Sequence, residues 1–388
     1  MRIYILTFFG DLLLRDMGPT VRIYNLAKGL ASLGHDVHVV IPGWNSFDKQ
    51  VDGLTVHSIK GTFPPAVLGV FSKLVGVSRP TSLFFYDFGF ITKVSRMILE
   101  SDVVQIEEQE GGGFLIPIIS RVLKKTIVVD CHDVFQALRL KHTSAVRAVL
   151  ETFLEKLAYR FSSAILTVSE KEKRLLVSYG VTGNRIHVVP NGVDVDAFNP
   201  SVDVRRIKDR YGLRNFQTVV FVGNMEYSPN QEAAQVIASE IAPRIQKEVG
   251  NVKFLMVGRT ARMELPYLTF TGVVDNVAEL LAVSDVAVAP LLHGSGTRLK
   301  ILEYFSCGLP VVSTSVGVEG LDVKNGVHVV IEDDMEKFAF QVIGLLKGNT
   351  LSNKLRKNAR DLVIDKYDWK KTSEHLHRVY EILLRATT

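Results

Sequence analysis

Cysteine is scarce in this 388-residue chain, and long uncharged apolar runs are absent from it. The two cysteines, Cys131 and Cys307, are far apart in apolar surroundings, which argues against a disulfide framework or zinc site and favours a reducing compartment. No stretch reaches about 18 uncharged apolar residues, so a membrane-spanning helix is not expected. The opening MRIYILTFFG reaches Asp11 without a small-residue cleavage site, and we interpret it as a buried strand. We therefore expect a cytoplasmic protein.

Two common phosphate-binding motifs are also missing. No G-x-G-x-x-G follows the first apolar run, which argues against a dinucleotide dehydrogenase, and no G-x-x-x-x-G-K-[ST] indicates a P-loop ATPase. The basic clusters at 124–125 and 171–174 have no interleaved aromatic residues, so nucleic acid is not an expected partner. The net charge of +5 fits a phosphorylated small molecule, an anionic membrane surface or nucleic acid, and selects none of them by itself.

Short apolar runs alternate with helical patterns along the first half of the chain. Strands are predicted at 3–9, 36–42, 103–106, 126–129 and 164–168, and a helix follows Gly18-Pro19. Such alternation is typical of a parallel sheet covered on both faces.

The same alternation begins again after RIHVVPNGVDVDAFNP, which we interpret as a connection. Strands are predicted at 218–224, 252–258, 285–290 and 310–314, and an amphipathic helix ends the chain. The pattern predicts an α/β protein with two doubly wound, Rossmann-like domains and a cleft between them. We place one domain at 1–195, a second at 196–365, and at 366–388 a helix packing back towards the first domain.

The segment 61–86 differs from its surroundings. It is rich in Val, Leu and Phe, carries only Lys73 and Arg79 as charges, and is interrupted by prolines and glycines, so it cannot be one regular helix. Two interpretations stay open: buried cover for the first sheet, or an apolar surface with basic edges that contacts lipid or a lipid-linked partner.

The stretch HGSGTRLKILEYFSCGLP, 293–310, carries the clearest chemistry. Ser295 or Thr297 can cap a helix that begins near Arg298, and such a helix start presents N–H groups to an anion. Arg298 adds a planar fork for phosphate oxygens and Lys300 a compact positive charge. Glu303 lies within two turns of the cap, where its carboxylate could accept both hydroxyls of a ribose. The alternative is a capped amphipathic helix whose charges face water.

Further polar residues follow other predicted strands. Gly223 and Asn224 end the strand at 218–222, and His132 follows the strand at 126–129, where it could bond a sugar hydroxyl or stabilise charge. No His or Cys lies at metal-ligand spacing from His132 in the sequence, so we do not expect a metal site there. Asp194 and Asp196 resemble a divalent-metal motif in outline, but they follow Pro-Asn-Gly and we assign them to the interdomain turn.

With these motifs in view, the chain resembles the retaining glycosyltransferases of family 4, which have the GT-B fold. The matching pieces are Gly18 with LAKGLASLGHDVHVV, CHD at 131–133, VVPNGVDVDAF, FVGN, TGVVDNVAELLAVSDVAVAP, the 293–310 stretch, CGLPVVST and the helix at Asp368-Trp369. The resemblance implies transfer of a sugar from a nucleoside diphosphate sugar to a glycan or lipid-linked acceptor, without a resident cofactor or metal.

The resemblance also implies roles for particular residues. The resemblance places His132 on the donor sugar, and we expect it to be catalytic together with Arg298 and Lys300, which are our own assignment. The expected donor-binding residues are Gly18, Gly223, Asn224, Val274, Gly294, Ser295, Gly296, Thr297, Leu299 and Glu303. Front-face displacement, in which the leaving phosphate helps to deprotonate the acceptor, agrees with the lack of an evident nucleophile.

The chain departs from the family pattern in two places. Ser295 stands where the family usually has the first of two glutamates, and no Arg or Lys follows the strand at 218–222, where Asn224 and Asn230 lie instead. We hypothesise that Arg298 and Lys300 supply the missing positive charge. A nucleotide-sugar 2-epimerase or a phosphorylase on the same fold, and a non-catalytic nucleotide-sugar binding protein, are the alternatives.

Overall fold

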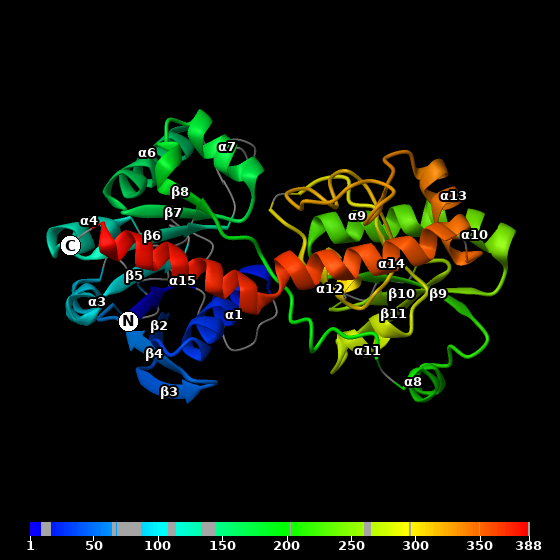
Figure 1. Ribbon diagram of the computed structural model, residues 1–388, viewed down its shortest axis with the longest axis horizontal. Coiled ribbons are helices and arrows are strands. Elements are labelled where there is room, and N and C mark those ends of the chain that lie inside the picture. Colours follow the sequence, from blue (N-terminus) through cyan, green and yellow to red (C-terminus); the bar gives the residue numbers. More distant parts are fainter. Residues whose placement is uncertain are drawn as a thin grey trace. The chain divides into compact units, whose positions relative to one another are not determined.

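Short, largely buried strands form the centre of each half of the protein. The computed structural model describes residues 1–8, 17–63, 67, 87–107, 114–132, 145–201, 203–259, 265–294, 296–348 and 350–386. The chain divides into unit 1, Met1–Pro190 with Trp369–Thr388, and unit 2, Asn191–Asp368. Each unit has its own sheet (Figure 1). The two doubly wound α/β units predicted from the sequence are therefore present.

Unit 1 has an eight-stranded sheet in the order β3-β4-β2-β1-β5-β6-β7-β8. The strands are β1 Arg2–Leu6, β2 Asp36–Gly43, β3 Phe47–Val51, β4 Leu54–Lys60, β5 Val103–Glu107, β6 Thr126–Cys131, β7 Ala164–Thr167 and β8 Ile186–Val188. All neighbours pair in parallel except β3, which pairs antiparallel with β4. Strands β5, β6 and β7 are buried along their whole length, as expected for a sheet covered on both faces.

The helices of unit 1 connect and cover these strands. They are α1 Gly18–Ser32, α3 Phe88–Glu100, α4 Leu115–Val122, α6 Ala145–Phe161, α7 Glu170–Ser178, the 3-10 turn η3 Gly183–Arg185 and the terminal helix α15 Trp369–Arg385. The antiparallel strand β3 was not predicted, because its exposed sequence FDKQV lacks an apolar face and forms only the edge of the sheet.

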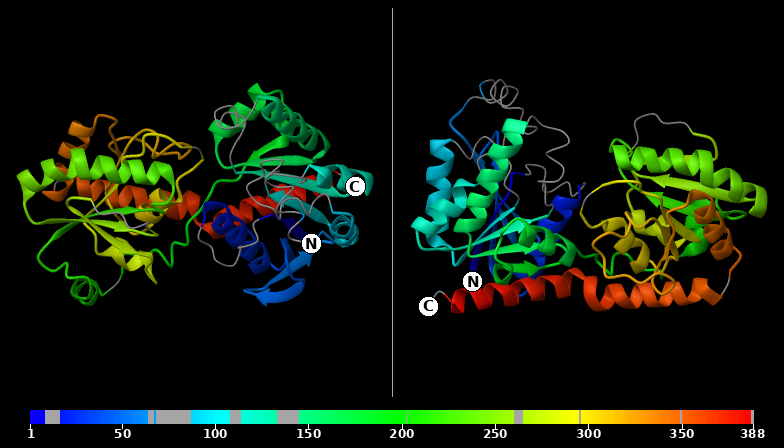
Figure 2. Two further views of the ribbon diagram at one scale, coloured as in Figure 1. Left: turned by 180° about the vertical axis from the view of Figure 1, so that it is seen from behind. Right: turned by 90° about the horizontal axis from the view of Figure 1, so that it is seen from above.

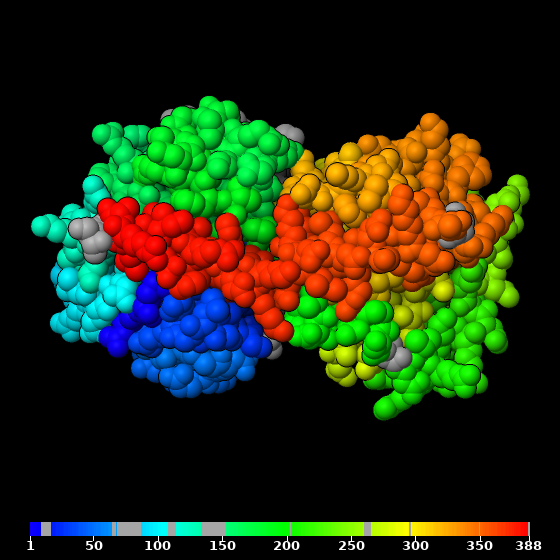
Figure 3. Space-filling model, in the orientation of Figure 1, coloured from blue at the N-terminus to red at the C-terminus, as the bar shows by residue number. Residues whose placement is uncertain are grey.

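Helix α15 packs against α1 within unit 1 (Figure 1). Its apolar stripe is real, since Leu376, Val379 and Tyr380 are buried. Close packing requires Gly29 of α1, because a Cβ there would lie 2.0 Å from the Oγ atom of Ser373. The opposite face of α15 is exposed on the surface (Figure 3).

Unit 2 has a six-stranded, wholly parallel sheet in the order β11-β10-β9-β12-β13-β14. The strands are β9 Gln217–Val222, β10 Val252–Val257, β11 Leu268–Gly272, β12 Val286–Ala289, β13 Val311–Ser313 and β14 Val330–Ile331. The helices are α8 Val204–Arg210, α9 Ser228–Val236, α10 Ala242–Val249, α11 Val277–Ala282, α12 Leu299–Ser306, α13 Met335–Leu346 and α14 Thr350–Leu362, with π-helical turns η4 Ile237–Ile241 and η5 Val363–Tyr367.

Two apolar clusters fill the two faces of this sheet. Successive residues of β9 alternate between them, so that Phe221 packs in one cluster and Val220 in the other. Helices lie on both sides of the sheet (Figure 2). Helix α12 is held in the core by Ile301, Leu302 and Phe305, which are all buried. No helix in the described ranges is long and apolar enough to cross a membrane.

Candidate functional site

The carboxyl end of β9 meets the start of two helices in unit 2. Gly223 follows β9 directly, Asn230 lies in α9 and Lys300 in α12. The Lys300 Nζ atom donates a hydrogen bond of 2.8 Å to Asn230 Oδ1 and lies 4.1 Å from the centroid of the Phe221 ring. A Cβ at Gly223 would lie 2.8 Å from the Asn230 side chain and 3.0 Å from Lys300 Nζ. Glycine at 223 therefore makes this close approach possible.

The first turn of α12 differs in one detail from the expectation. Thr297 is not the capping residue: the N-cap is Arg298, whose side chain offers no hydrogen-bond acceptor. The Thr297 hydroxyl instead accepts a hydrogen bond of 2.6 Å from Asn191 Nδ2. Ser295 lies outside the described residues. The N-cap side chain therefore leaves the leading N–H groups of the helix for another acceptor.

Arg298 folds back over the loop that precedes it. Its Nη1 atom donates a hydrogen bond of 2.7 Å to the carbonyl oxygen of Gly296. Gly294 has φ of 138°, and a Cβ there would lie 2.6 Å from Arg298 Nη2. The absence of a side chain at Gly294 thus makes room for the guanidinium group.

Lys300 and Glu303 carry charge in a poorly hydrated place. Burial lowers the pKa of Lys300 to about 7, and the nearby Arg298 adds to this effect. Burial likewise raises the pKa of Glu303 to about 7, against the opposing influence of Lys300. Within the described part of the chain, the Glu303 carboxylate has no hydrogen-bond or ion-pair partner, and Lys300 influences it only electrostatically. The pair therefore costs folding energy that a bound anion and a bound hydroxyl could offset.

Tyr304 fixes the position of α12 relative to β9. Its hydroxyl oxygen accepts a hydrogen bond of 2.7 Å from the backbone N–H of Val222, and its ring is fully buried. This contact holds the helix next to Gly223, and the sequence analysis missed it because Tyr304 reads as an ordinary apolar position.

The remaining predicted donor residues lie around the same sheet or in unit 1. The Asn224 carbonyl oxygen accepts a hydrogen bond of 2.8 Å from Asn230 Nδ2, so Asn224 belongs to the group at β9. Val274 follows β11 and packs on the apolar core, and Leu299 is the half-buried first residue of α12. Gly18 begins α1 in unit 1.

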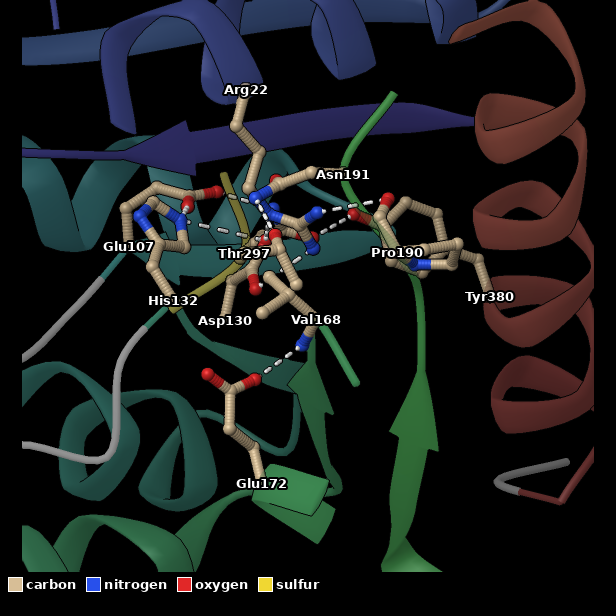
Figure 4. Close-up of polar contacts among 11 residues, drawn as sticks. Arg22, Glu107, Asp130, His132, Val168, Glu172, Pro190, Asn191, Thr297 and Tyr380 are labelled. Carbon is tan, nitrogen blue, oxygen red and sulfur yellow. Dashed lines mark hydrogen bonds and ion pairs between the residues drawn. The ribbon is translucent and has the colours of Figure 1, made fainter. Parts of the chain in front are cut away.

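His132 lies in a buried charged cluster at the carboxyl ends of β5 and β6 in unit 1 (Figure 4). Its Nε2 atom is 2.6 Å from Glu107 Oε2 and 3.7 Å from Asp130 Oδ2. Asp130 accepts two hydrogen bonds from Arg22 of α1, 3.0 Å from Nε and 3.1 Å from Nη2. Arg22 also donates to the carbonyl oxygen of Pro190 at 3.2 Å.

All four side chains of this cluster are buried, and burial is the main cause that raises the pKa of Glu107, with Asp130 adding to it. His132 opposes this rise in the pKa of Glu107, because its ring bonds the carboxylate. The contact between Oε2 and Nε2 fixes the orientation of the ring.

Glu107, Asp130 and His132 each offer a ligand atom within 4.8 Å of the others. Both oxygens of Asp130 already bind Arg22, which places a positive charge where a metal ion would bind. The contact between Arg22 and Asp130 is a buried salt bridge.

The sequence analysis predicted His132 but missed Arg22, Glu107 and the Asn230 contact to Lys300. Glu107 was recoverable, because it directly follows the predicted strand at 103–106, much as His132 follows the predicted strand at 126–129. Arg22 was not, because nothing in a helical pattern indicates that one cation turns inward to meet a carboxylate 108 residues away.

Comparison with known proteins agrees with these motifs. Residues 18–197 match Glycosyltransferase Family 4, and residues 216–348 match Glycosyl transferases group 1. A phosphatidyl-myo-inositol mannosyltransferase of Mycolicibacterium smegmatis is 26% identical over 386 residues, which cover 95% of this chain and 91% of that protein. A UDP-Gal:alpha-D-GlcNAc-diphosphoundecaprenol alpha-1,3-galactosyltransferase of Escherichia coli is 25% identical over 72% of this chain and 75% of its own length.

Solved structures share the fold. The Anabaena protein HepE in complex with UDP has a TM-score of 0.74 at 17% identity, covering 98% of this chain and 100% of its own. Sucrose-phosphate synthase from Thermosynechococcus elongatus has a TM-score of 0.72 at 16% identity, with both chains covered completely. These likenesses show the GT-B fold that the motifs predict. With family matches across most of both units, the chain belongs to glycosyltransferase family 4, among the group 1 glycosyltransferases.

Proposed function

We propose that this glycosyltransferase moves a sugar from a nucleoside diphosphate sugar to a hydroxyl of a glycan or lipid-linked glycan, with retention at the anomeric carbon. The observation that carries the proposal is the position of Lys300. A half-buried ammonium group with a pKa lowered to about 7 lies beside Gly223 and the uncapped start of α12. A diphosphate in this place would restore the charge that burial disfavours.

We assign each part of the donor a partner. Lys300, Arg298 and the N–H groups at the start of α12 bind the pyrophosphate. Glu303, two turns or less into the helix, accepts the ribose hydroxyls. His132, oriented by Glu107, bonds the donor sugar, which agrees with the role that the family resemblance implies.

The chemical step needs little besides this electrostatic arrangement. As the glycosidic bond breaks, negative charge grows on the leaving diphosphate, and fixed positive groups stabilise it more than they stabilise the ground state. The leaving phosphate oxygen takes the proton of the acceptor hydroxyl on the same face of the sugar, which gives retention. Arg298 and Lys300 supply the charge that a divalent cation would otherwise bring, so we propose that no resident metal is required.

The acceptor side carries an apolar surface that favours a membrane-bound substrate. Most of 61–86 lies outside the described residues, but Phe63 and Val67 within it and Phe88 just beyond it are 43%, 52% and 84% exposed. The two relatives named above act, by their names, on lipid acceptors. We propose peripheral membrane contact here. Phe88→Ser should reduce co-flotation of the protein with anionic vesicles. Phe340→Ser, which replaces an exposed phenylalanine of unit 2, is the control and should not reduce it.

The test of function has two stages. Calorimetry with UDP, GDP and ADP identifies the base, and NMR of the product anomeric proton then follows turnover of matching donors, with and without EDTA. Nucleoside diphosphate released only with acceptor, unaffected by EDTA and with retained configuration, supports the proposal. Epimerised donor without acceptor, a requirement for inorganic phosphate, or tight binding with no turnover would each indicate a different activity.

A further inference from the structure

A hollow of about 330 Å³ lies in unit 1 between α3 and the β3–β4 edge of the sheet. It is distant in the sheet order from the His132 cluster, since β2 and β1 separate β4 from β5. Its lining residues are Ser46, Asp48, Ser58, Ile59, Lys93, Arg96 and Met97. Nothing in the proposed donor chemistry uses it.

Two cations on one face of α3 line this hollow. Lys93 and Arg96 are three residues apart, so they lie on the same face of the helix, and both are exposed. Glu100, one turn beyond Arg96, lies 3.8 Å from Arg2 Nη1 instead. Among the described residues, neither cation has a hydrogen-bond or ion-pair partner. Like charges at this spacing repel each other, and an anion between them would remove the repulsion.

The other walls supply a hydroxyl donor and an apolar surface. Ser46 Oγ accepts a hydrogen bond of 3.0 Å from the backbone N–H of Lys60, which leaves its own hydroxyl hydrogen for another acceptor. Ile59 is 5% exposed and forms an apolar wall beside Met97. Asp48 is the one carboxylate in the lining, and its Oδ1 atom is bonded at 2.8 Å to His57 Nδ1.

From this arrangement we infer a second binding site, for a phosphate group attached to a carbon skeleton. Lys93, the Arg96 fork and the Ser46 hydroxyl bind the phosphate oxygens, and Ile59 with Met97 contact the attached carbons. The volume suits a phosphorylated sugar or a lipid headgroup and exceeds what inorganic phosphate needs. The site belongs to unit 1 and does not depend on where the donor binds.

The experiment measures binding of glucose 1-phosphate by calorimetry, with UDP present at saturation so that the start of α12 is occupied. The wild-type protein is expected to bind, and Lys93→Ala/Arg96→Ala to bind at least about tenfold more weakly. Ser46→Ala should lose roughly threefold, the effect of one hydrogen bond. Lys93→Arg/Arg96→Lys should retain binding. Arg121→Ala/Arg174→Ala removes the same net charge from exposed positions elsewhere in unit 1 and should bind like wild type.

A second arm distinguishes the source of the phosphate. Binding to phosphatidylcholine vesicles with and without phosphatidic acid is compared with binding of free glucose 1-phosphate. A preference for phosphatidic acid identifies a lipid headgroup as the ligand, and a preference for glucose 1-phosphate identifies a phosphorylated sugar. Either preference should be lost in Lys93→Ala/Arg96→Ala. Equal binding by wild type and this variant, or equal loss in the Arg121→Ala/Arg174→Ala control, would overturn the inference. The glucose 1-phosphate titration is repeated without UDP in Lys300→Met, which alters the donor site, and binding is expected to equal that of the wild type. If the wild type binds glucose 1-phosphate but not UDP, the result counts only against the proposed function.

Discussion

The Nζ atom of Lys300 lies 2.8 Å from Oδ1 of Asn230, a neutral amide, and no carboxylate of the described residues forms an ion pair with it. Burial without a counter-ion explains why the pKa of Lys300 falls to about 7. Glu303, one turn along the same helix, has a pKa raised to about 7 for the same reason. The free protein thus holds a cation and a carboxyl group in a place that a nucleotide would suit better than water.

Lys300→Met tests this cost of burial. In the wild type the unfolded chain, with a Lys pKa of 10.5, binds more protons than the folded chain between pH 7 and 10.5, so the free energy of unfolding rises with pH over that range. The variant lacks this rise. Between pH 7 and 9 the stability of wild type should therefore increase relative to Lys300→Met by about 1–3 kcal/mol, measured by urea unfolding.

The same variant should bind UDP at least about tenfold more weakly, because it lacks the ammonium group. Lys247→Met on α10, an exposed position, is the matched control and should change neither property. A pH-independent stability difference would show that the Lys300 charge is not buried.

The pH dependence of kcat/KM should be bell-shaped with both limbs near pH 7. Glu303 must be ionised to accept ribose hydroxyls, so activity rises as pH passes about 7 from below. Lys300 must be protonated, so in the free enzyme activity falls as pH passes about 7 from above. Glu303→Gln should remove the acid limb. In kcat, which reports the donor complex, the alkaline limb should move to higher pH because the diphosphate raises the pKa of Lys300. A flat kcat/KM between about pH 6 and 8 would contradict these assignments.

Arg298→Ala should reduce UDP affinity and turnover together. Its guanidinium bonds the Gly296 carbonyl and fills the space at Gly294, so its loss removes both a charge and the support of the loop. We expect about a tenfold to hundredfold fall in kcat/KM, with partial recovery in Arg298→Lys. Arg205→Ala, an exposed arginine of α8, is the control. Unchanged donor binding in Arg298→Ala would show that the loop binds no diphosphate.

Glu107→Gln should separate catalysis from nucleotide binding. The amide has nearly the same shape, but it lacks the negative charge that faces His132 Nε2. Under the proposed function kcat falls by about tenfold or more while the Kd for UDP stays within about twofold, because UDP binds to unit 2. His132→Ala should show the same split. A parallel loss of UDP affinity and of thermal stability would instead assign Glu107 a purely structural role.

Sequence patterns predicted much of the fold because its strands are short and buried. The apolar runs VVQIE and TIVVDC predict buried strands, and the bounds of β5 and β6 lie within a residue or two of the predicted ranges. Strand β3 could not be found in this way, because its residues are largely exposed and only its backbone pairing with β4 reveals it.

The candidate site was predicted where its functional residues lie close together in the sequence, as in the stretch from Gly294 to Glu303. Contacts between distant segments were not accessible: Asn230 beneath Lys300, and Arg22 with Asp130, depend on the placement of helices. The predicted cap at Thr297 was wrong because Asn191, more than a hundred residues earlier, competes for its hydroxyl.

The most direct test is a crystal structure of the protein with bound UDP. The account predicts the β-phosphate oxygens within hydrogen-bond distance of Lys300 Nζ and of the N–H groups at the start of α12, with the ribose on Glu303. A diphosphate bound elsewhere, with Lys300 still directed at Asn230 alone, would contradict it.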